Sequence, residues 1–195
     1  MESFLRTHGT VMSEEDIIRF CSPTLAGIKP GNLFTATYDD SEQLQKELDV
    51  LANRLSAKGV KILSLRQKQG RALLYFYRPC LLKECLRHLD ARLLLQQRGY
   101  PPDQPQRCLK KLWQHLQTES DFPHEIGLFL GYPPEDVQGF IEQKACNSKC
   151  TGCWKVYGDQ KKAEQIFDRY KKCTACFLAN WQRGVSLEQL TVKKV

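Results

Sequence analysis

A stripe of leucines at helical spacing constrains the fold of this chain more than its other features. The stripe consists of four residues that recur every three or four positions: Leu44, Leu48, Leu51 and Leu55. It follows "NLFTATY" (32–38), whose apolar and β-branched content predicts a strand, and Gly59 can close the helix. Two strands, "VKILSLR" and "RALLYFYRP", and a second helix, "LLKECLRHLDARLLLQQRG", come next. The opening half therefore predicts a β-α-β-β-α unit.

Helical patterns dominate the residues that follow. After the breaker "YPPDQP" (100–105) comes a helix with one apolar side, made of Cys108, Leu109, Leu112, Trp113 and Leu116. Residues 121–144 predict two short helices, with Gly131 as a left-handed stop between them. Further on, "WKVY" (154–157) predicts a short strand, and a helix follows it.

Together these patterns predict an α/β fold, with α+β as the alternative. We expect a small mixed sheet of about four strands flanked by helices, because an isolated two-stranded hairpin is marginally stable. The fourth strand would be residues 154–157. Residues 1–144 would form the core, with a helical second half, and residues 145–195 a cysteine-rich strand-helix segment packed on it.

The composition is that of an ordinary globular chain, at 42% hydrophobic and 26% charged residues over 195 positions. Neither an eighteen-residue apolar run nor a signal-peptide pattern occurs, so we expect no membrane segment and a cytoplasmic location. Thiols stay reduced in that compartment. The nine cysteines are therefore interpreted as thiols.

The net charge of +7 is concentrated near the C-terminus. Residues 142–195 carry 11 Lys and Arg against 5 Asp and Glu, whereas residues 1–141 carry 18 against 17. Nucleic-acid binding is one interpretation, but zinc-bound thiolates would also attract this surplus. The helix "PEDVQGFIEQ" starts with carboxylates that a duplex would repel. Nucleic-acid binding through the basic C-terminal region is therefore the third hypothesis for the function, after a metal-binding protein and a thiol-dependent enzyme.

Five of the nine cysteines lie between residues 145 and 176. Four of them form two C-x-x-C pairs separated by nineteen residues, a spacing typical of a four-cysteine zinc site: Cys150, Cys153, Cys173 and Cys176. Cys146 adds a C-x-x-x-C-x-x-C pattern, so an iron–sulfur cluster is the second candidate cofactor. For Cys80, Cys85 and Cys108 we expect buried, structural thiols.

Three stretches carry a resemblance to a known family: "FCSPTLAGIKPGNLF" (20–34), "FPHEIGLFLGYPPEDVQGFI" (122–141), and "KCTGCWKVYGD" (149–159) with "YKKCT" (170–174). Together they resemble an uncharacterised bacterial family, frequent in anaerobic Firmicutes and known only as a domain of unknown function. The resemblance implies no reaction. In that family a tyrosine often takes the position of Cys153 and Cys176 is not part of the pattern, which implies that Cys150 and Cys173 are the essential pair.

A thiol-dependent enzyme is the alternative to a metal-binding protein. Cys21 and Lys29 lie in a glycine-containing loop that could supply a nucleophile or hold a small anion. His124 could act as a base with Glu125 beside it, if the fold brings them to Cys21. Position 128 is Leu, so the zinc-protease motif H-E-x-x-H is absent. The expected partners are a small anionic ligand or another protein.

Overall fold

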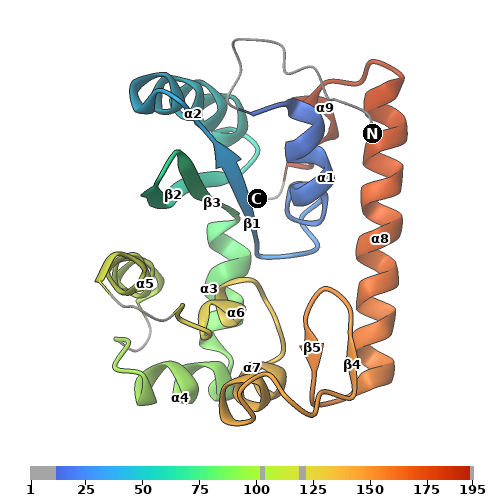
Figure 1. Ribbon diagram of the computed structural model, residues 1–195. Helices are drawn as coiled ribbons and strands as arrows, with labels where there is room; N and C mark the ends of the chain where they lie inside the picture. Colours follow the sequence, from blue (N-terminus) through green and yellow to red (C-terminus); the bar gives the residue numbers. More distant parts are fainter. Residues whose placement is uncertain (1–11, 102–103, 119–121, 194–195) are drawn as a thin grey trace, which may run out of the picture.

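The computed structural model describes residues 12–101, 104–118 and 122–193 (Figure 1). Its helices are α1 (Glu14–Leu25), α2 (Ser41–Ser56), α3 (Pro79–Arg87), α4 (Leu89–Gln97), α5 (Pro105–Thr118), α6 (Ile126–Phe129), α7 (Pro134–Glu142), α8 (Gln160–Gln182) and α9 (Leu187–Leu190). Its strands are β1 (Gly31–Thr37), β2 (Lys61–Lys68), β3 (Arg71–Tyr77), β4 (Cys150–Thr151) and β5 (Lys155–Val156). The predicted class, a small sheet flanked by helices, is confirmed.

The main sheet has three strands in the order β1-β3-β2, and each pairing is antiparallel. Gln69 and Gly70 join β2 to β3 with φ angles of 51° and 71°, the left-handed conformation that a tight hairpin turn requires. On β3, Tyr75 lies between Leu33 of β1 and Leu63 of β2. Because side chains alternate along a strand, Tyr75 points to the face opposite Leu74.

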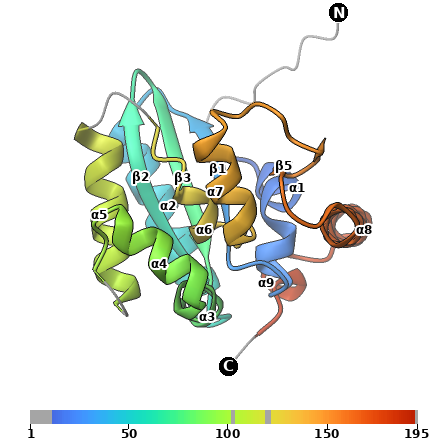
Figure 2. The ribbon, with the colours of Figure 1, turned by 90° about the horizontal axis from the view of Figure 1, so that it is seen from below.

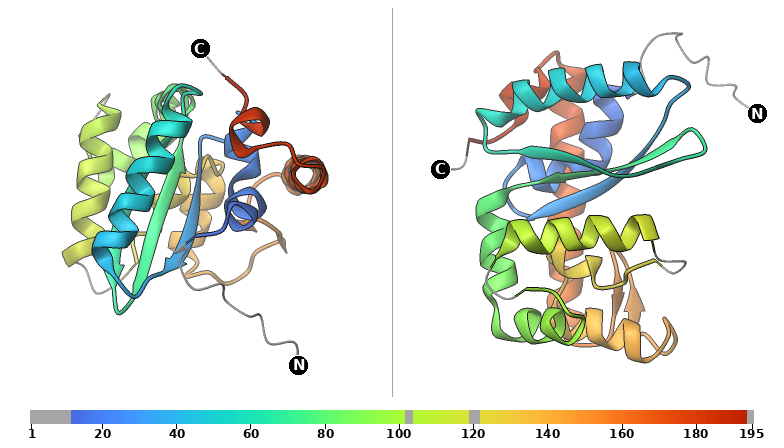
Figure 3. Two further views of the ribbon diagram at one scale, coloured as in Figure 1. Left: turned by 90° about the horizontal axis from the view of Figure 1, so that it is seen from above. Right: turned by 90° about the vertical axis from the view of Figure 1, so that its left-hand side faces the viewer.

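Helices cover both faces of this sheet. One face packs against α1, α2, α8 and α9, through a cluster that includes Leu74 and Phe76. The other packs against α3 to α7, through a cluster that includes Tyr75 and Tyr77. Figure 2 shows the sheet between α4 and α5 on one side and α1 and α8 on the other, and the right-hand view of Figure 3 shows it between α2 and α5. The four leucines of the helical stripe are all buried in the first cluster.

The strand predicted at residues 154–157 does not join the main sheet, as we expected it to. Its central part, β5, pairs with β4 in a separate two-stranded hairpin, in which Cys150 lies opposite Val156. The backbone N–H groups of Tyr157 and Gly158 donate to the side chain of Asp136 in α7. These donors are therefore used by a helix and not by a neighbouring strand, which accounts for the separate hairpin.

Arg78, between β3 and α3, is a fully buried cation that the sequence analysis did not identify. Its guanidinium group donates to the carbonyl oxygens of Thr24 and Leu25, at the end of α1, and of Lys58, just after α2. It also donates to the carbonyl oxygen of Val192, at 2.7 Å. Carbonyl groups at helix ends lack partners within the helix and favour a positive charge. Arg78 thus joins three segments that are distant in sequence.

The cysteines outside the C-terminal segment differ in burial. Cys21 and Cys108 are buried and Cys85 is half-buried, whereas Cys80 is exposed, against expectation. The buried stripe of α3 is formed by Leu82 and Leu86, and position 80 lies off that stripe.

Within the three described ranges, no helix combines the length and the apolar character needed to span a membrane. The cytoplasmic location stays a prediction.

Candidate functional site

Five side chains from four parts of the chain lie beside the β4–β5 hairpin, and we call this group the junction site: Lys29, Tyr132, Cys153, Trp154 and Tyr170. The ring of Tyr132 stacks on that of Trp154, with centroids 4.8 Å apart. The Tyr132 hydroxyl donates to the carbonyl oxygen of Cys153, at 3.2 Å. The three stretches on which the family resemblance rests therefore converge here. Figure 1 shows the hairpin between α7 and the first half of α8.

Lys29 is the unusual member of the junction site, because only 5% of its surface is exposed. Its Nζ lies 5.4 Å from the ring centroid of Tyr132 and 5.6 Å from that of Tyr170, so both rings contribute cation–π contacts. Burial lowers the pKa of Lys29 to about 8, and the thiol groups of Cys153 and Cys21 oppose this shift. Among the described residues, no carboxylate pairs with it. A buried amine of this kind marks a candidate functional position.

Asp136 fixes the hairpin against α7. Its carboxylate is only 3% exposed and accepts three hydrogen bonds of 2.7 Å: from Trp154 Nε1 and from the backbone N–H groups of Tyr157 and Gly158. Such charge-assisted bonds are stronger than those between neutral groups. A Cβ atom on Gly139 would lie 2.5 Å from the Tyr157 ring, so α7 and the hairpin are in close contact. These contacts join this part of the cysteine-rich segment to α7.

A pocket of about 230 Å³ opens beside the junction site, on the face of the sheet opposite α1. Tyr132 and Trp154 form one wall, and the remaining lining residues are Leu33, Phe122, His124, Ile126, Gly127, Leu130, Asp136, Val137, Phe140 and Lys155. The walls are mostly apolar and aromatic, as in binding sites for small molecules. The Nζ of Lys155 donates to the carbonyl oxygen of Ala145, at 2.6 Å, and the His124 ring lies edge-on to Phe140 at 4.9 Å.

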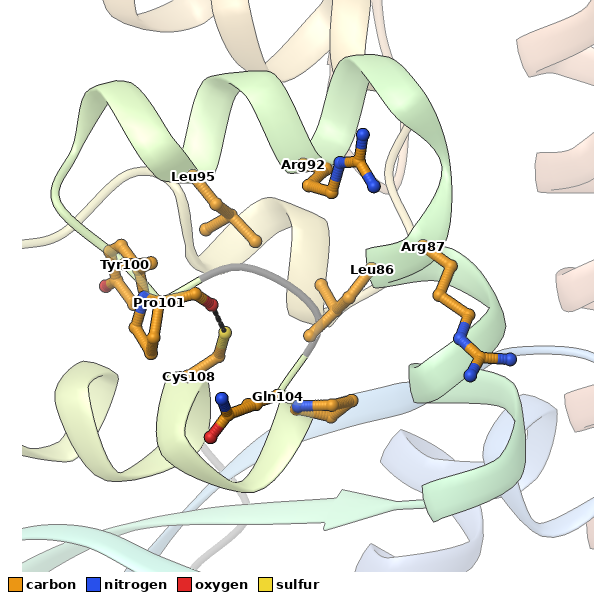
Figure 4. A pocket seen from close by; sticks show the side chains of 9 residues that line it. Leu86, Arg87, Arg92, Leu95, Tyr100, Pro101, Gln104 and Cys108 are labelled. Atoms are coloured by element: carbon orange, nitrogen blue, oxygen red, sulfur yellow. Dashed lines mark hydrogen bonds between the residues drawn. The ribbon is translucent and has the colours of Figure 1, made fainter.

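A second pocket lies between α3, α4 and α5 and is shown in Figure 4. The Sγ of Cys108 points to the carbonyl oxygen of Pro101 there, at 3.1 Å. Its volume of about 10 Å³ has room for roughly one water molecule. Of these two pockets, only the one beside the junction site has room for a small organic molecule.

The structure does not gather the predicted metal ligands. Cys150 packs in the cluster between the hairpin and α8, whereas Cys173 packs in the cluster between α1 and α8. Cys176 and Cys146 are exposed, and burial raises the pKa of Cys173 to about 11. Across the described ranges, no three His, Cys, Asp or Glu side chains are grouped to hold a metal ion. A zinc or iron–sulfur site therefore stays a prediction.

The residues predicted for a thiol enzyme are only partly brought together. Cys21 lies close enough to Lys29 for their charges to interact, but it is fully buried in the α1 cluster, and burial raises its pKa to about 12. His124 borders the pocket on the other face of the sheet. Glu125 points elsewhere, because its buried carboxylate accepts a hydrogen bond from Tyr100, at 2.9 Å. A site built on Cys21, His124 and Glu125 stays a prediction.

Most of the junction site was not predicted from the sequence. Lys29 was predicted to take part in a thiol-dependent enzyme site and Cys153 to bind a metal. Tyr132, Trp154 and Tyr170 were not predicted to belong to a site. A tryptophan directly after a C-x-x-C pair was the available signal, because a large aromatic residue in a polar segment needs a surface to pack on. Its partner Asp136 was interpreted as one of the carboxylates that would repel a nucleic-acid duplex.

The fold and the site define a small α/β protein that has a buried lysine beside an apolar pocket. Comparison with known proteins assigns this chain to a family: it belongs to the family described as protein of unknown function (DUF3793), whose model matches residues 17–191. Neither the curated proteins nor the solved structures gave a match. The taxonomic range implied by the sequence resemblance stays a prediction.

Proposed function

We propose that this protein binds a small organic anion, an apolar planar molecule that carries one carboxylate, in the pocket beside the junction site. The pocket itself is the observation that carries the proposal: an aromatic wall and aliphatic sides enclose about 230 Å³ next to two basic side chains. Pockets for drug-sized ligands have about 300–1,000 Å³, so the occupant is small. This proposal retains the small anionic partner that the sequence suggested.

The charges around the pocket support an anion. Lys155 uses one of its three donors on Ala145, and His124 is exposed at the edge of the pocket. Lys29 adds a further positive charge behind the Tyr132 ring. The one carboxylate in the lining, that of Asp136, already accepts three hydrogen bonds from the hairpin. Apart from Asp136 and the phenol of Tyr132, the ionisable side chains that line the pocket are therefore basic: His124 and Lys155.

The test is a titration followed through the indole N–H signals of the tryptophans by NMR. Trp154 lines the pocket, whereas Trp113 lies on the exposed side of α5 and serves as an internal control. We expect a saturable shift of the Trp154 signal with indole-3-acetate and a several-fold weaker response with the neutral indole-3-acetamide. An exposed charge contact contributes up to about 1 kcal/mol, which corresponds to about fivefold in affinity.

Two pairs of variants locate the binding. Leu33 and Leu63 flank Tyr75 on the same face of the sheet, but only Leu33 lines the pocket, so Leu33→Phe should abolish the shift and Leu63→Phe should leave it. Lys155 and Lys149 each donate to a backbone carbonyl oxygen, but only Lys155 lines the pocket. Lys155→Met should weaken binding and Lys149→Met should not.

The proposal fails if one-ring and two-ring aromatic carboxylates leave the Trp154 signal unmoved at about 10 mM. It also fails if the two members of each pair of variants behave alike, since binding would then take place elsewhere.

A further inference from the structure

We propose that the segment between α7 and β4 is a switch that reports occupancy of the pocket at the protein surface. The segment comprises residues 143–148, and we call it the switch loop. A carboxylate bound in the pocket takes the amine of Lys155 away from the loop, and the loop then opens. This inference rests on the proposed anion binding and adds a regulatory consequence to it.

The first observation is the position of Lys155, which contacts both the pocket and the switch loop. It lines the pocket, and its Nζ donates to the carbonyl oxygen of Ala145, in the loop, at 2.6 Å. Within the described part of the chain, this is the one side-chain hydrogen bond that joins the switch loop to the β4–β5 hairpin. A ligand that binds the amine of Lys155 therefore acts directly on the loop.

The second, independent observation is the backbone conformation of the switch loop. Lys144, Ala145 and Asn147 have φ angles of 48°, 63° and 57°, in the left-handed region that favours glycine. Asparagine is tolerated there, whereas lysine and alanine are disfavoured. Each of these two residues lowers the population of this conformation by about fivefold or more. The closed loop is therefore strained, and opening releases the strain.

Few contacts hold the switch loop closed against this strain. The backbone N–H group of Ala145 donates to the carbonyl oxygen of Phe140, at 2.9 Å. That of Cys146 donates to the carbonyl oxygen of Gln143, also at 2.9 Å. Most residues of the loop are exposed, so side-chain packing adds little. The bond from Lys155 is the charged member of this small set, and its loss should have a large effect.

An anion in the pocket competes with the loop for the amine of Lys155. A bond between an ammonium group and a carboxylate joins two charges, so it is stronger than the bond to the neutral carbonyl oxygen of Ala145. Strain favours the same direction, because the open loop regains an ordinary backbone conformation. A neutral ligand of the same shape lacks the charge that displaces the carbonyl oxygen. Anion binding and loop opening are therefore coupled through one side chain.

The experiment follows two signals of the reduced full-length protein, with a chelator present so that no metal on Cys146 contributes. The Trp154 indole signal reports occupancy of the pocket, and amide hydrogen exchange at Ala145 and Cys146 reports opening of the loop. We expect saturating indole-3-acetate to raise the exchange rate of both amides about fivefold. Indole-3-acetamide, added until the shift of the Trp154 signal is the same, should leave the exchange rates unchanged.

Variants test the connection without a ligand. Lys155→Met removes the donor to Ala145 and should raise the exchange rates about tenfold, whereas Lys149→Met removes a donor to Gly158 and should not. Ala145→Gly relieves the backbone and should lower the exchange rates about fivefold. Asn147→Gly is the matched control for strain, because asparagine tolerates its φ of 57°, and its effect should be smaller.

The two signals separate failure of the switch from failure of anion binding. A shifted Trp154 signal with unchanged exchange at Ala145 and Cys146 would overturn the switch and leave anion binding intact. Equal opening by the acetate and the acetamide, or wild-type exchange in Lys155→Met, would also overturn the switch alone. An unmoved Trp154 signal would overturn both proposals.

Discussion

Replacing Arg78 by methionine is expected to lower the free energy of unfolding by about 3–5 kcal/mol, the range found when one partner of a buried charged interaction is removed. The side chain keeps most of its length, but the carbonyl oxygens of Thr24, Leu25, Lys58 and Val192 all lose a donor. An unsatisfied buried acceptor costs about 1–3 kcal/mol. The ends of α1 and α2 would then be unpartnered inside the protein.

Urea denaturation followed by circular dichroism measures this loss. Arg71→Met is the matched control, because Arg71 is an exposed residue at the start of β3, the strand that leads to Arg78. We expect it to change stability by no more than about 0.5 kcal/mol. If both variants unfold at the same urea concentration, Arg78 does not have the role assigned to it.

Replacing Asp136 by asparagine is expected to release the hairpin from α7. The carboxylate accepts three hydrogen bonds, whereas the amide of asparagine brings an oxygen and a nitrogen, and the nitrogen cannot accept. At least one donor among Trp154, Tyr157 and Gly158 would lose its acceptor. Since a hydrogen bond to a charged group contributes about 1.5–3 kcal/mol, the free energy of opening the hairpin should fall by about 2–3 kcal/mol.

Amide hydrogen exchange of residues 149–158 and the position of the Trp154 indole signal measure this opening. Glu135→Gln removes the same charge from the neighbouring residue in the same helical turn, and Glu135 is exposed. Its exchange should match that of the wild type. Equal protection of the hairpin in Asp136→Asn would show that packing on α8 alone holds it.

Local pattern was sufficient to predict many of the helices and strands, but the loop predicted around Cys21 was wrong, because Cys21 lies in α1 (Glu14–Leu25). The strand predicted at residues 32–38 corresponds to β1 (Gly31–Thr37), and Gly131 has a φ of 74°, the left-handed stop that was expected between two short helices. These features depend on neighbours within a few residues. The helix predicted across "LLKECLRHLDARLLLQQRG" is instead divided into α3 and α4, because the backbone of His88 leaves the helical conformation at a ψ of 134°.

The junction site could not be predicted in the same way, because its contacts are distant in sequence. Lys29 meets Tyr170 across 141 residues of chain, counted as the difference between the two positions, and no periodic pattern relates them. The C-x-x-C pairs have a spacing typical of a zinc site, so the sequence favoured metal binding at these positions. Asp136 provides an anchor for the hairpin that a sequence pattern does not reveal.

Two explanations exist for what holds residues 145–176 in place: a metal site, or protein contacts such as those of the junction site. They predict opposite effects of metal removal on this segment. Amide hydrogen exchange of the reduced protein, measured before and after verified removal of metal by a chelator, separates them directly. We expect the hairpin and the first half of α8 to keep their protection without metal, because Asp136, Tyr132 and Phe167 hold them. Loss of protection confined to residues 145–176 after chelation would contradict this and favour a zinc or iron–sulfur site.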